Sequence, residues 1–180
     1  MKKEHYNFSF IIDDNFPYIA FTCASECIRV ANLDRLKSFF DFKTYSINNN
    51  FVQASNGKTW TCDGTIEDID ETDYIFLFTG ENYNEVDIKK VSSFLRVQHH
   101  KQIPIVGIGA GAFILAEAGL LNHNKVAVHW KFKKNFQEKF PYLNLVNDLW
   151  VANDNQVNTC AGALTMLDFM LDLIKKYCGA

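Results

Sequence analysis

The sequence lacks several features that would each place it in a particular class of protein. Only three of its 180 residues are proline, whereas sixteen are phenylalanine, which argues against a disordered chain. No apolar run is long enough to span a bilayer, and no apolar leader follows Met1, so we expect a cytoplasmic protein without a membrane partner. The five cysteines form no Cys-x-x-Cys pair and are odd in number, which indicates reduced thiols.

Basic charge and metal-ligand spacing are also missing. The formal net charge is −3, whereas nucleic-acid-binding domains usually carry a basic patch or stripe, so we do not expect this chain itself to contact DNA. None of the five histidines has the spacing of a zinc site with the cysteines, and we predict no metal.

Strand-like and helix-like segments alternate along the chain. This alternation predicts one domain over residues 1–180, a three-layer α/β fold whose mostly parallel sheet has helices on both faces. The expected strands are 8–12, 42–47, 74–78 and 103–108, with a hairpin at 51–55 and 58–62 and short pieces at 125–128, 144–146, 149–152 and 156–159. The expected helices are 17–32, 85–100, 112–121, 131–140 and 161–177.

Two of these helices have apolar residues at helical spacing, from which we predict their buried faces. For helix 17–32 these residues are Ile19, Cys23, Cys27 and Val30, and for helix 161–177 they are Leu164, Leu167, Leu171 and Ile174.

The glycine-rich turn after strand 103–108 is the most informative motif. Gly107-x-Gly109-x-Gly111 has the form of a nucleophile elbow, in which the central residue is normally a reactive Ser or Cys. Gly109 has no side chain, so the pattern favours binding over catalysis, and we predict no catalytic residue. The glycines also fit a dinucleotide fingerprint, but residues 126–130 lack the acid that would bind a ribose, so we predict no cofactor. A third interpretation is that the glycines only permit a tight turn.

Ligands of open α/β sheets lie outside the carboxyl ends of the strands. Gly109 and Ala110 lie at such an end, where the amides at the start of the next helix favour an anion. Thr79, Gly80 and Glu81 end the buried strand 74–78 at the same edge and are candidate ligand contacts, although they fit a plain loop equally well.

Several blocks of the chain, in order, resemble one family. The segment 105–121 resembles the elbow helix of PfpI-type, class I glutamine-amidotransferase-like domains, and most resembles the sensor domains of AraC-family transcriptional regulators. The other matching blocks are 26–32, 54–57, 128–130, 139–141 and 158–162 leading into 167–171. The resemblance implies a flavodoxin-like fold, homodimerisation and control of catabolic operons by a small-molecule effector. It also implies a helix-turn-helix DNA-binding domain C-terminal to this chain.

Four further residues are candidates for ligand contacts, each with a simpler alternative. Glu26 matches an acid that faces the elbow in the catalytic branch, and it could instead be a structural carboxylate. His129 could bond the ligand or stabilise the fold, and Trp130 could stack on a quaternary ammonium or only pack. Cys160, before the last helix, could approach the site or be a small packing residue.

These observations predict a non-catalytic domain that senses a small amino or quaternary-ammonium metabolite near Gly109. One alternative is a PfpI-like hydrolase or glyoxalase-like enzyme with a displaced nucleophile, such as Cys160. A second alternative is a purely structural dimerisation module, which would have no ligand cavity above Gly109.

Overall fold

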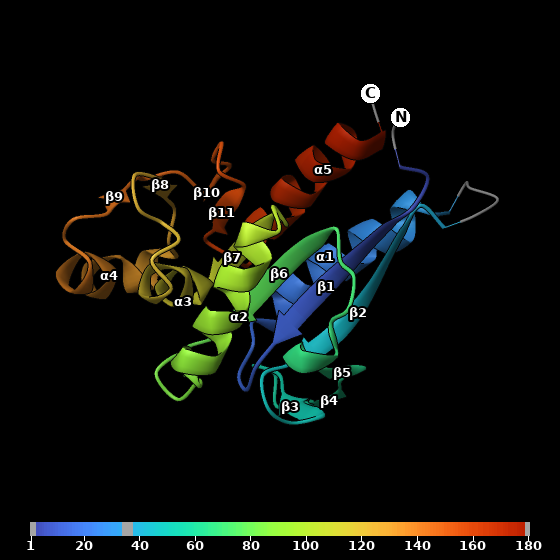
Figure 1. Ribbon diagram of the computed structural model, residues 1–180, viewed down its shortest axis with the longest axis horizontal. Coiled ribbons are helices and arrows are strands. Elements are labelled where there is room, and N and C mark those ends of the chain that lie inside the picture. Colours follow the sequence, from blue (N-terminus) through green and yellow to red (C-terminus); the bar gives the residue numbers. More distant parts are fainter. Residues whose placement is uncertain (1–2, 34–37, 179–180) are drawn as a thin grey trace.

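The centre of the protein is a seven-stranded sheet, seen in the computed structural model of residues 3–33 and 38–178 (Figure 1). The strand order is β10-β11-β7-β6-β1-β2-β5, and every neighbouring pair is parallel except β10 with β11. The strands are β1 (Tyr6–Ile12), β2 (Phe40–Ser46), β5 (Gly64–Thr65), β6 (Tyr74–Thr79), β7 (Ile105–Gly109), β10 (Trp150–Val151) and β11 (Val157–Cys160). The predicted three-layer, mostly parallel α/β fold is confirmed.

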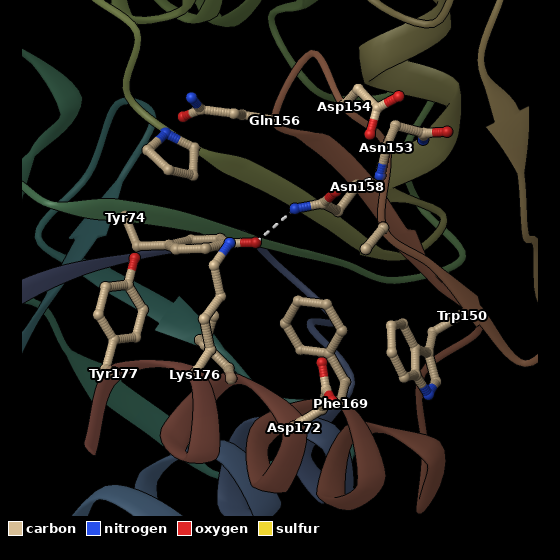
Figure 2. A pocket seen from close by; sticks show the side chains of 13 residues that line it. Tyr74, Trp150, Asn153, Asp154, Gln156, Asn158, Phe169, Asp172, Lys176 and Tyr177 are labelled. Atoms are coloured by element: carbon tan, nitrogen blue, oxygen red, sulfur yellow. Dashed lines mark hydrogen bonds between the residues drawn. The ribbon is translucent and has the colours of Figure 1, made fainter. Parts of the chain in front are cut away.

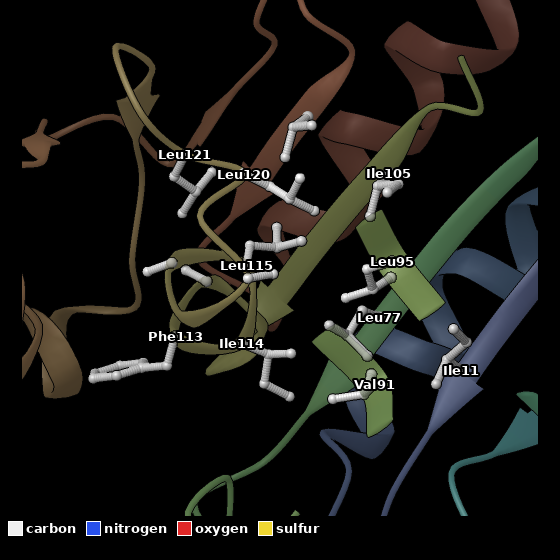
Figure 3. Packing of buried hydrophobic residues seen from close by; sticks show 14 of the residues in the cluster. Ile11, Leu77, Val91, Leu95, Ile105, Phe113, Ile114, Leu115, Leu120 and Leu121 are labelled. Carbon is white, nitrogen blue, oxygen red and sulfur yellow. The ribbon is translucent and has the colours of Figure 1, made fainter. Parts of the chain in front are cut away.

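Helices cover both faces of this sheet because its central strands are apolar on both sides. All six residues of β6 are buried, as a strand between two layers requires. Aliphatic side chains such as Leu77 and Ile105 pack against α2 (Ile88–His100) and α3 (Gly111–Glu117), as Figure 3 shows. Phenylalanines such as Phe10 and Phe76 face the other way, toward α1 (Tyr18–Ala31) and α5 (Thr165–Cys178).

Smaller elements lie at the ends of the sheet. The predicted hairpin is present as β3 (Phe51–Gln53) and β4 (Thr59–Thr61), with Gly57 in its turn at φ 80°. A parallel pair, β8 (Lys125–Val126) with β9 (Asn144–Leu145), lies beside α4 (Lys133–Lys139). Two 3-10 turns complete the secondary structure, η1 (Ile66–Asp68) and η2 (Trp130–Phe132).

The predicted buried stripe of the last helix is wrong. Leu164, Leu167 and Leu171 are 41–65% exposed, whereas the buried residues of α5 are Met166, Phe169, Met170 and Leu173. The same error occurs on α1, where Ile19 and Val30 are half exposed and the buried residues are Ala20, Phe21, Ala24, Cys27 and Ile28. Both helices carry apolar residues on more than one face, and on α1 only Cys27 of the four predicted residues is buried.

The strand register places the ends of β6, β7 and β11 at one edge of the sheet. Thr79, the last residue of β6, pairs with Gly109, the last residue of β7, and Cys160 at the end of β11 pairs with Ile108. The loops that follow these strands therefore meet above the carboxyl end of the sheet, where the sequence predicts a binding site. Within the described residues, no helix is long and apolar enough to cross a membrane.

Candidate functional site

A cavity of about 480 Å³ lies above the end of β7, a size that suits a small metabolite. Six segments surround it: the β1–α1 loop with the start of α1, the turn of the β3–β4 hairpin, the loop after β6, the elbow, the turn before α4 and the loop before α5. Its lining residues are Asn15, Pro17, Ile19, Ser55, Thr79, Gly80, Glu81, Gly109, His129, Lys131, Phe132, Ala161, Gly162 and Ala163. Residues that are far apart in the sequence thus form one concave surface.

Gly109 forms the floor of this cavity and leaves no room for a side chain. Its φ is +66°, in the left-handed region that glycine adopts without strain. A Cβ atom added there would lie 2.8 Å from the carbonyl oxygen of Thr79, which also accepts a hydrogen bond of 3.0 Å from the amide of Ala110. The elbow is therefore packed closely against β6, and a side chain at position 109 would require the elbow or the end of β6 to shift.

Gly80 brings the first loop close to this floor. A Cβ at Gly80 would lie only 1.8 Å from the carbonyl oxygen of Asn15. The backbone after β6 thus touches the backbone after β1, which places Pro17 and Ile19 beside Thr79 at the cavity.

Thr79 contributes a buried hydroxyl that lacks a partner. The residue is 1% exposed, and its Oγ1 has no hydrogen bond to any described residue. Native proteins rarely leave such a group unsatisfied, because an unpaired buried hydroxyl costs about 1–3 kcal/mol. Thr79 lines the cavity, but its Oγ1 is itself inaccessible, so a ligand reaches this oxygen only after the atoms that cover it move.

An ion pair spans two of the cavity's walls. Lys131 Nζ lies 2.5 Å from Glu81 Oε1, which links the loop after β6 to the turn before α4. Both side chains are about half exposed, so the pair contributes about 0–1 kcal/mol to stability. A pair held this weakly can open at small cost and offers both a positive and a negative charge to a ligand.

His129 lies beside the ion pair, in surroundings that favour its neutral form. Burial lowers the pKa of its imidazole and the charge of Lys131 lowers that pKa further, whereas the charge of Glu81 raises it. Nδ1 accepts a hydrogen bond of 3.3 Å from the backbone amide of Lys131. The neutral ring therefore carries its proton on Nε2, which makes it a hydrogen-bond donor.

The structure brings some predicted site residues together and places others elsewhere. Thr79, Gly80, Gly109 and His129 all line the cavity, and Ala110 lies buried directly behind its floor. Trp130 does not line it, because the indole is 77% exposed and points into solvent beside the His129 ring.

The prediction for Glu26 must be corrected. It lies in the middle of α1, outside the cavity, where its carboxylate is exposed and pairs with Arg29 at 2.8 Å. The hydrogen bond from Arg29 lowers the pKa of this carboxyl. The acid that lines the cavity is Glu81.

Cys160 also lies outside the cavity lining. It is fully buried, and its Sγ lies 3.4 Å from Thr165 Oγ1. Burial raises the pKa of the thiol, which is the opposite of what a nucleophile needs. The structure therefore gives no support to the alternative of an enzyme with a displaced cysteine. Among the described residues, no group of three His, Cys, Asp or Glu side chains could hold a metal.

The reasoning from sequence missed several lining residues. Asn15, Pro17 and Ser55 belong to loops far from the elbow in the chain, and Lys131 and Phe132 lie two and three residues after His129. For Asn15 and Pro17 a signal was available, because they follow a predicted parallel strand and so belong at the same edge.

A second cavity, of about 470 Å³, lies at the opposite edge of the sheet, beside α5 (Figure 2). Its buried polar pair is already satisfied, since Asn158 Nδ2 donates to the Tyr74 hydroxyl at 2.5 Å and Asn158 Oδ1 accepts from the amide of Asn153. None of the predicted site residues lines it. The cavity above Gly109 is therefore the stronger candidate site.

Comparisons with known proteins identify similar sequences. The sequence model of the DJ-1/PfpI family matches residues 20–176. The chain is 30% identical over 168 residues to the HTH-type transcriptional regulator CdhR of Pseudomonas aeruginosa, covering 93% of this chain and 49% of that protein. It is 29% identical over 171 residues to the HTH-type transcriptional regulator GlxA of Rhizobium meliloti, covering 94% of this chain and 52% of that protein. The chain thus spans about half the length of these curated relatives.

Solved structures share the fold. An AraC family transcriptional regulator from Pseudomonas putida has a TM-score of 0.83 at 21% identity, over 97% of this chain and 93% of that chain. DJ-1beta of Drosophila melanogaster has a TM-score of 0.81 at 19% identity, over 98% and 92% of the two chains.

Proposed function

The chain belongs to the DJ-1/PfpI family, and from that premise we propose that it is the non-catalytic, effector-sensing domain of a transcriptional regulator. The relatives that it matches are transcriptional regulators of about twice its length, which supports this role. In the same proposal the chain acts as a homodimer, and DNA is bound by a part of the regulator outside this chain.

The observation that carries the proposal is a cavity lined by opposite charges whose floor is Gly109, in the place where a nucleophile elbow holds its reactive residue. Glycine has no reactive atom, and an added side chain would require the elbow or the end of β6 to shift. A binding site needs polar groups that a ligand can satisfy. Lys131, Glu81 and the imidazole of His129 supply them here.

The ligand in this proposal is a small zwitterion. Its carboxylate pairs with Lys131 and its cationic nitrogen with Glu81, so the ligand replaces each partner of the existing ion pair. Its apolar part packs against Pro17, Ile19 and Phe132 on the surrounding walls. Trp130, whose ring centroid lies 5.4 Å from that of His129, would cover a quaternary ammonium in this proposal only after its side chain turns inward.

Isothermal titration calorimetry with betaine, carnitine and arginine tests this proposal. We expect heat of binding for at least one of them, and a loss of about tenfold or more in affinity for Lys131→Gln and for Glu81→Gln. The matched control is Lys134→Gln, because Lys134 is an exposed lysine on α4 outside the cavity. If none of the three compounds binds, the zwitterion class is wrong. If binding is unchanged in both variants, the ligand does not use the ion pair.

A further inference from the structure

A further cavity, of about 690 Å³, lies over β1 and β2 on the side of the sheet that faces α2, and we call it the acidic cavity. Its lining comes from these two strands and from the segment that begins with η1 and leads to β6. The chain runs from β5 to β6 through this single 3-10 turn, and no lining residue belongs to an α-helix. The sheet is therefore left open here, and the cavity shares no residue with the one above Gly109.

Acids outnumber bases around the acidic cavity. Its charged lining residues are Asp41, Asp68, Asp70, Glu71 and Lys43. Asp68 already caps η1, and Asp41 lies 3.5 Å from Nε2 of His5. Asp70 and Glu71 are exposed, and neither forms an ion pair or a side-chain hydrogen bond with a described residue. The cavity therefore offers at least two unengaged carboxylates to a cation.

Two buried hydroxyls beneath these acids also lack partners. Ser9 is 2% exposed and Tyr45 is 8% exposed, and neither side-chain oxygen has a hydrogen bond within the described chain. Ser9 pairs with Lys43 in the strand register and Tyr45 lies two residues further along β2, so both side chains project from the same face into the cavity.

Buried hydroxyls are normally hydrogen-bonded, so this pair needs an explanation. In the part of the chain that the structure describes, the unpartnered side-chain oxygens that are also sealed are those of Thr79 and Ser92. The oxygens of Ser9 and Tyr45 are therefore open to the cavity, where a ligand can reach them without any rearrangement.

The charges around Tyr45 favour a donor with positive charge. Burial raises the pKa of its hydroxyl, and the charges of Asp63, Asp70 and Asp68 raise that pKa further. The hydroxyl thus keeps its proton and lies in a negative potential, with its lone pairs available to an N–H donor.

The spread of the carboxylates distinguishes between kinds of cation. No three acidic, histidine or cysteine side chains of the described residues come close enough together to hold a metal ion. Acids that line one cavity without converging suit a ligand whose positive charges are themselves separated. An alkylammonium group carries three N–H donors, which can bond to carboxylate and hydroxyl oxygens together.

We propose that the acidic cavity binds a linear aliphatic polyamine, with one ammonium group bonded to the oxygens of Ser9 and Tyr45 and another paired with Asp70 and Glu71. The volume lies within the range of small-molecule sites. The inference is independent of the proposed function, because the two cavities have no residue in common.

Isothermal titration calorimetry with spermidine, a triamine, tests the charged part of this site. At about 20 mM salt we expect saturable binding to the 180-residue chain. Asp70→Asn should weaken the affinity about tenfold, because it removes a charge-assisted hydrogen bond. The matched control is Asp148→Asn, which removes the same charge from an exposed position outside the cavity and should change the affinity by less than about twofold.

Tyr45→Phe tests the hydroxyls without changing any charge. We expect it to weaken spermidine binding about three- to tenfold and to leave the urea midpoint unchanged or higher, since the hydroxyl has no bond to lose in the free chain. Tyr142→Phe is its control, because Tyr142 is 69% exposed and lies outside the cavity. Its affinity should match that of the original chain.

Four results would overturn the inference. Spermidine that does not bind up to about 10 mM excludes the ligand class. Equal losses in Asp70→Asn and Asp148→Asn show only a general attraction to an acidic chain. Unchanged binding in Tyr45→Phe shows that the hydroxyls take no part. A loss in Glu81→Gln places spermidine in the cavity above Gly109 instead. None of these results decides whether a zwitterion binds above Gly109, which the separate titrations of Lys131→Gln and Glu81→Gln measure.

Discussion

Gly109→Ala is the substitution whose effect the structure defines most closely. Two separate costs arise at this residue. Alanine must adopt φ +66°, and its Cβ must occupy a point 2.8 Å from the carbonyl oxygen of Thr79. That oxygen belongs to the backbone of the central strand β6 and cannot turn aside as a flexible side chain would. The elbow or the strand end must therefore shift.

The two costs can be estimated separately. A left-handed conformation costs a residue other than glycine about 1–2 kcal/mol. A new atom in a closely packed interior costs about 1–3 kcal/mol. We therefore expect Gly109→Ala to lower the free energy of unfolding by about 2–5 kcal/mol. Gly57→Ala is the control, because Gly57 has φ +80° and nothing lies within 4 Å of its added Cβ. It should lose only about 1–2 kcal/mol.

Urea denaturation followed by circular dichroism measures both losses, and the difference between them isolates the contact with Thr79. If Gly109→Ala costs no more than Gly57→Ala, the elbow has free space and the steric part of the reasoning fails. The same result would remove the spatial objection to a nucleophile, and Gly109→Cys would then be worth assaying for hydrolysis.

Three further predictions concern buried groups. Thr79→Val should leave the free energy of unfolding unchanged or raise it by up to about 1 kcal/mol, and it should weaken ligand binding about three- to tenfold. Thr159→Val removes the hydroxyl that accepts a hydrogen bond from the Ala127 amide, so it should lower the free energy of unfolding by about 1–3 kcal/mol. Burial raises the pKa of Asp13 to about 6 from 3.8, so its stabilisation of the fold is complete below about pH 4 and is lost as the pH rises through 6. Asp13→Asn should therefore raise the free energy of unfolding by up to about 3 kcal/mol at pH 7.5 and hardly at all at pH 3.5, and equal effects at both values would contradict the pKa. Cys160 should react with iodoacetamide at least about tenfold more slowly than in the urea-unfolded chain, and labelling at an equal rate, read by peptide mass spectrometry, would show an accessible thiol.

The sequence was sufficient to predict how most strands and helices follow one another along the chain and at which edge of the sheet the cavity lies. The apolar run 74–78 and the strand before the glycine-rich turn are short, continuous and bounded by loop residues, which leaves few alternatives to a buried parallel sheet. Parallel strands then place the loops that follow them at one edge, so Thr79 and Gly109 could be paired before any coordinates were known.

The buried face of α5 could not be predicted in the same way. Its sequence contains one apolar ridge through Leu167, Leu171 and Ile174 and another through Met166, Phe169, Met170 and Leu173. Helical periodicity shows that both exist, but it does not say which faces the sheet. Only the packing partner decides, and here the phenylalanine-rich face of β1 and β6 takes the second ridge.

The prediction for Glu26 was wrong for a related reason. Its place in the chain matched an acid that faces the elbow in other members of the family, but the side chain's direction depends on how α1 is rotated about its axis. The rotation that buries Ala20, Ala24 and Ile28 turns Glu26 outward. Lys131 and Glu81, which do line the cavity, are joined through space across 50 residues of sequence, and no local pattern indicates such a pair.

Ile19 belongs to two surfaces at once. It lines the ligand cavity at the start of α1, and it is also half exposed on the apolar face of that helix. Ala163, another lining residue, lies two residues before α5 begins. A molecule bound in this cavity therefore touches the first turn of α1 and the loop that leads into α5. Because α1 and α5 pack against each other, a ligand that fixes these two segments also restrains the ends of both helices.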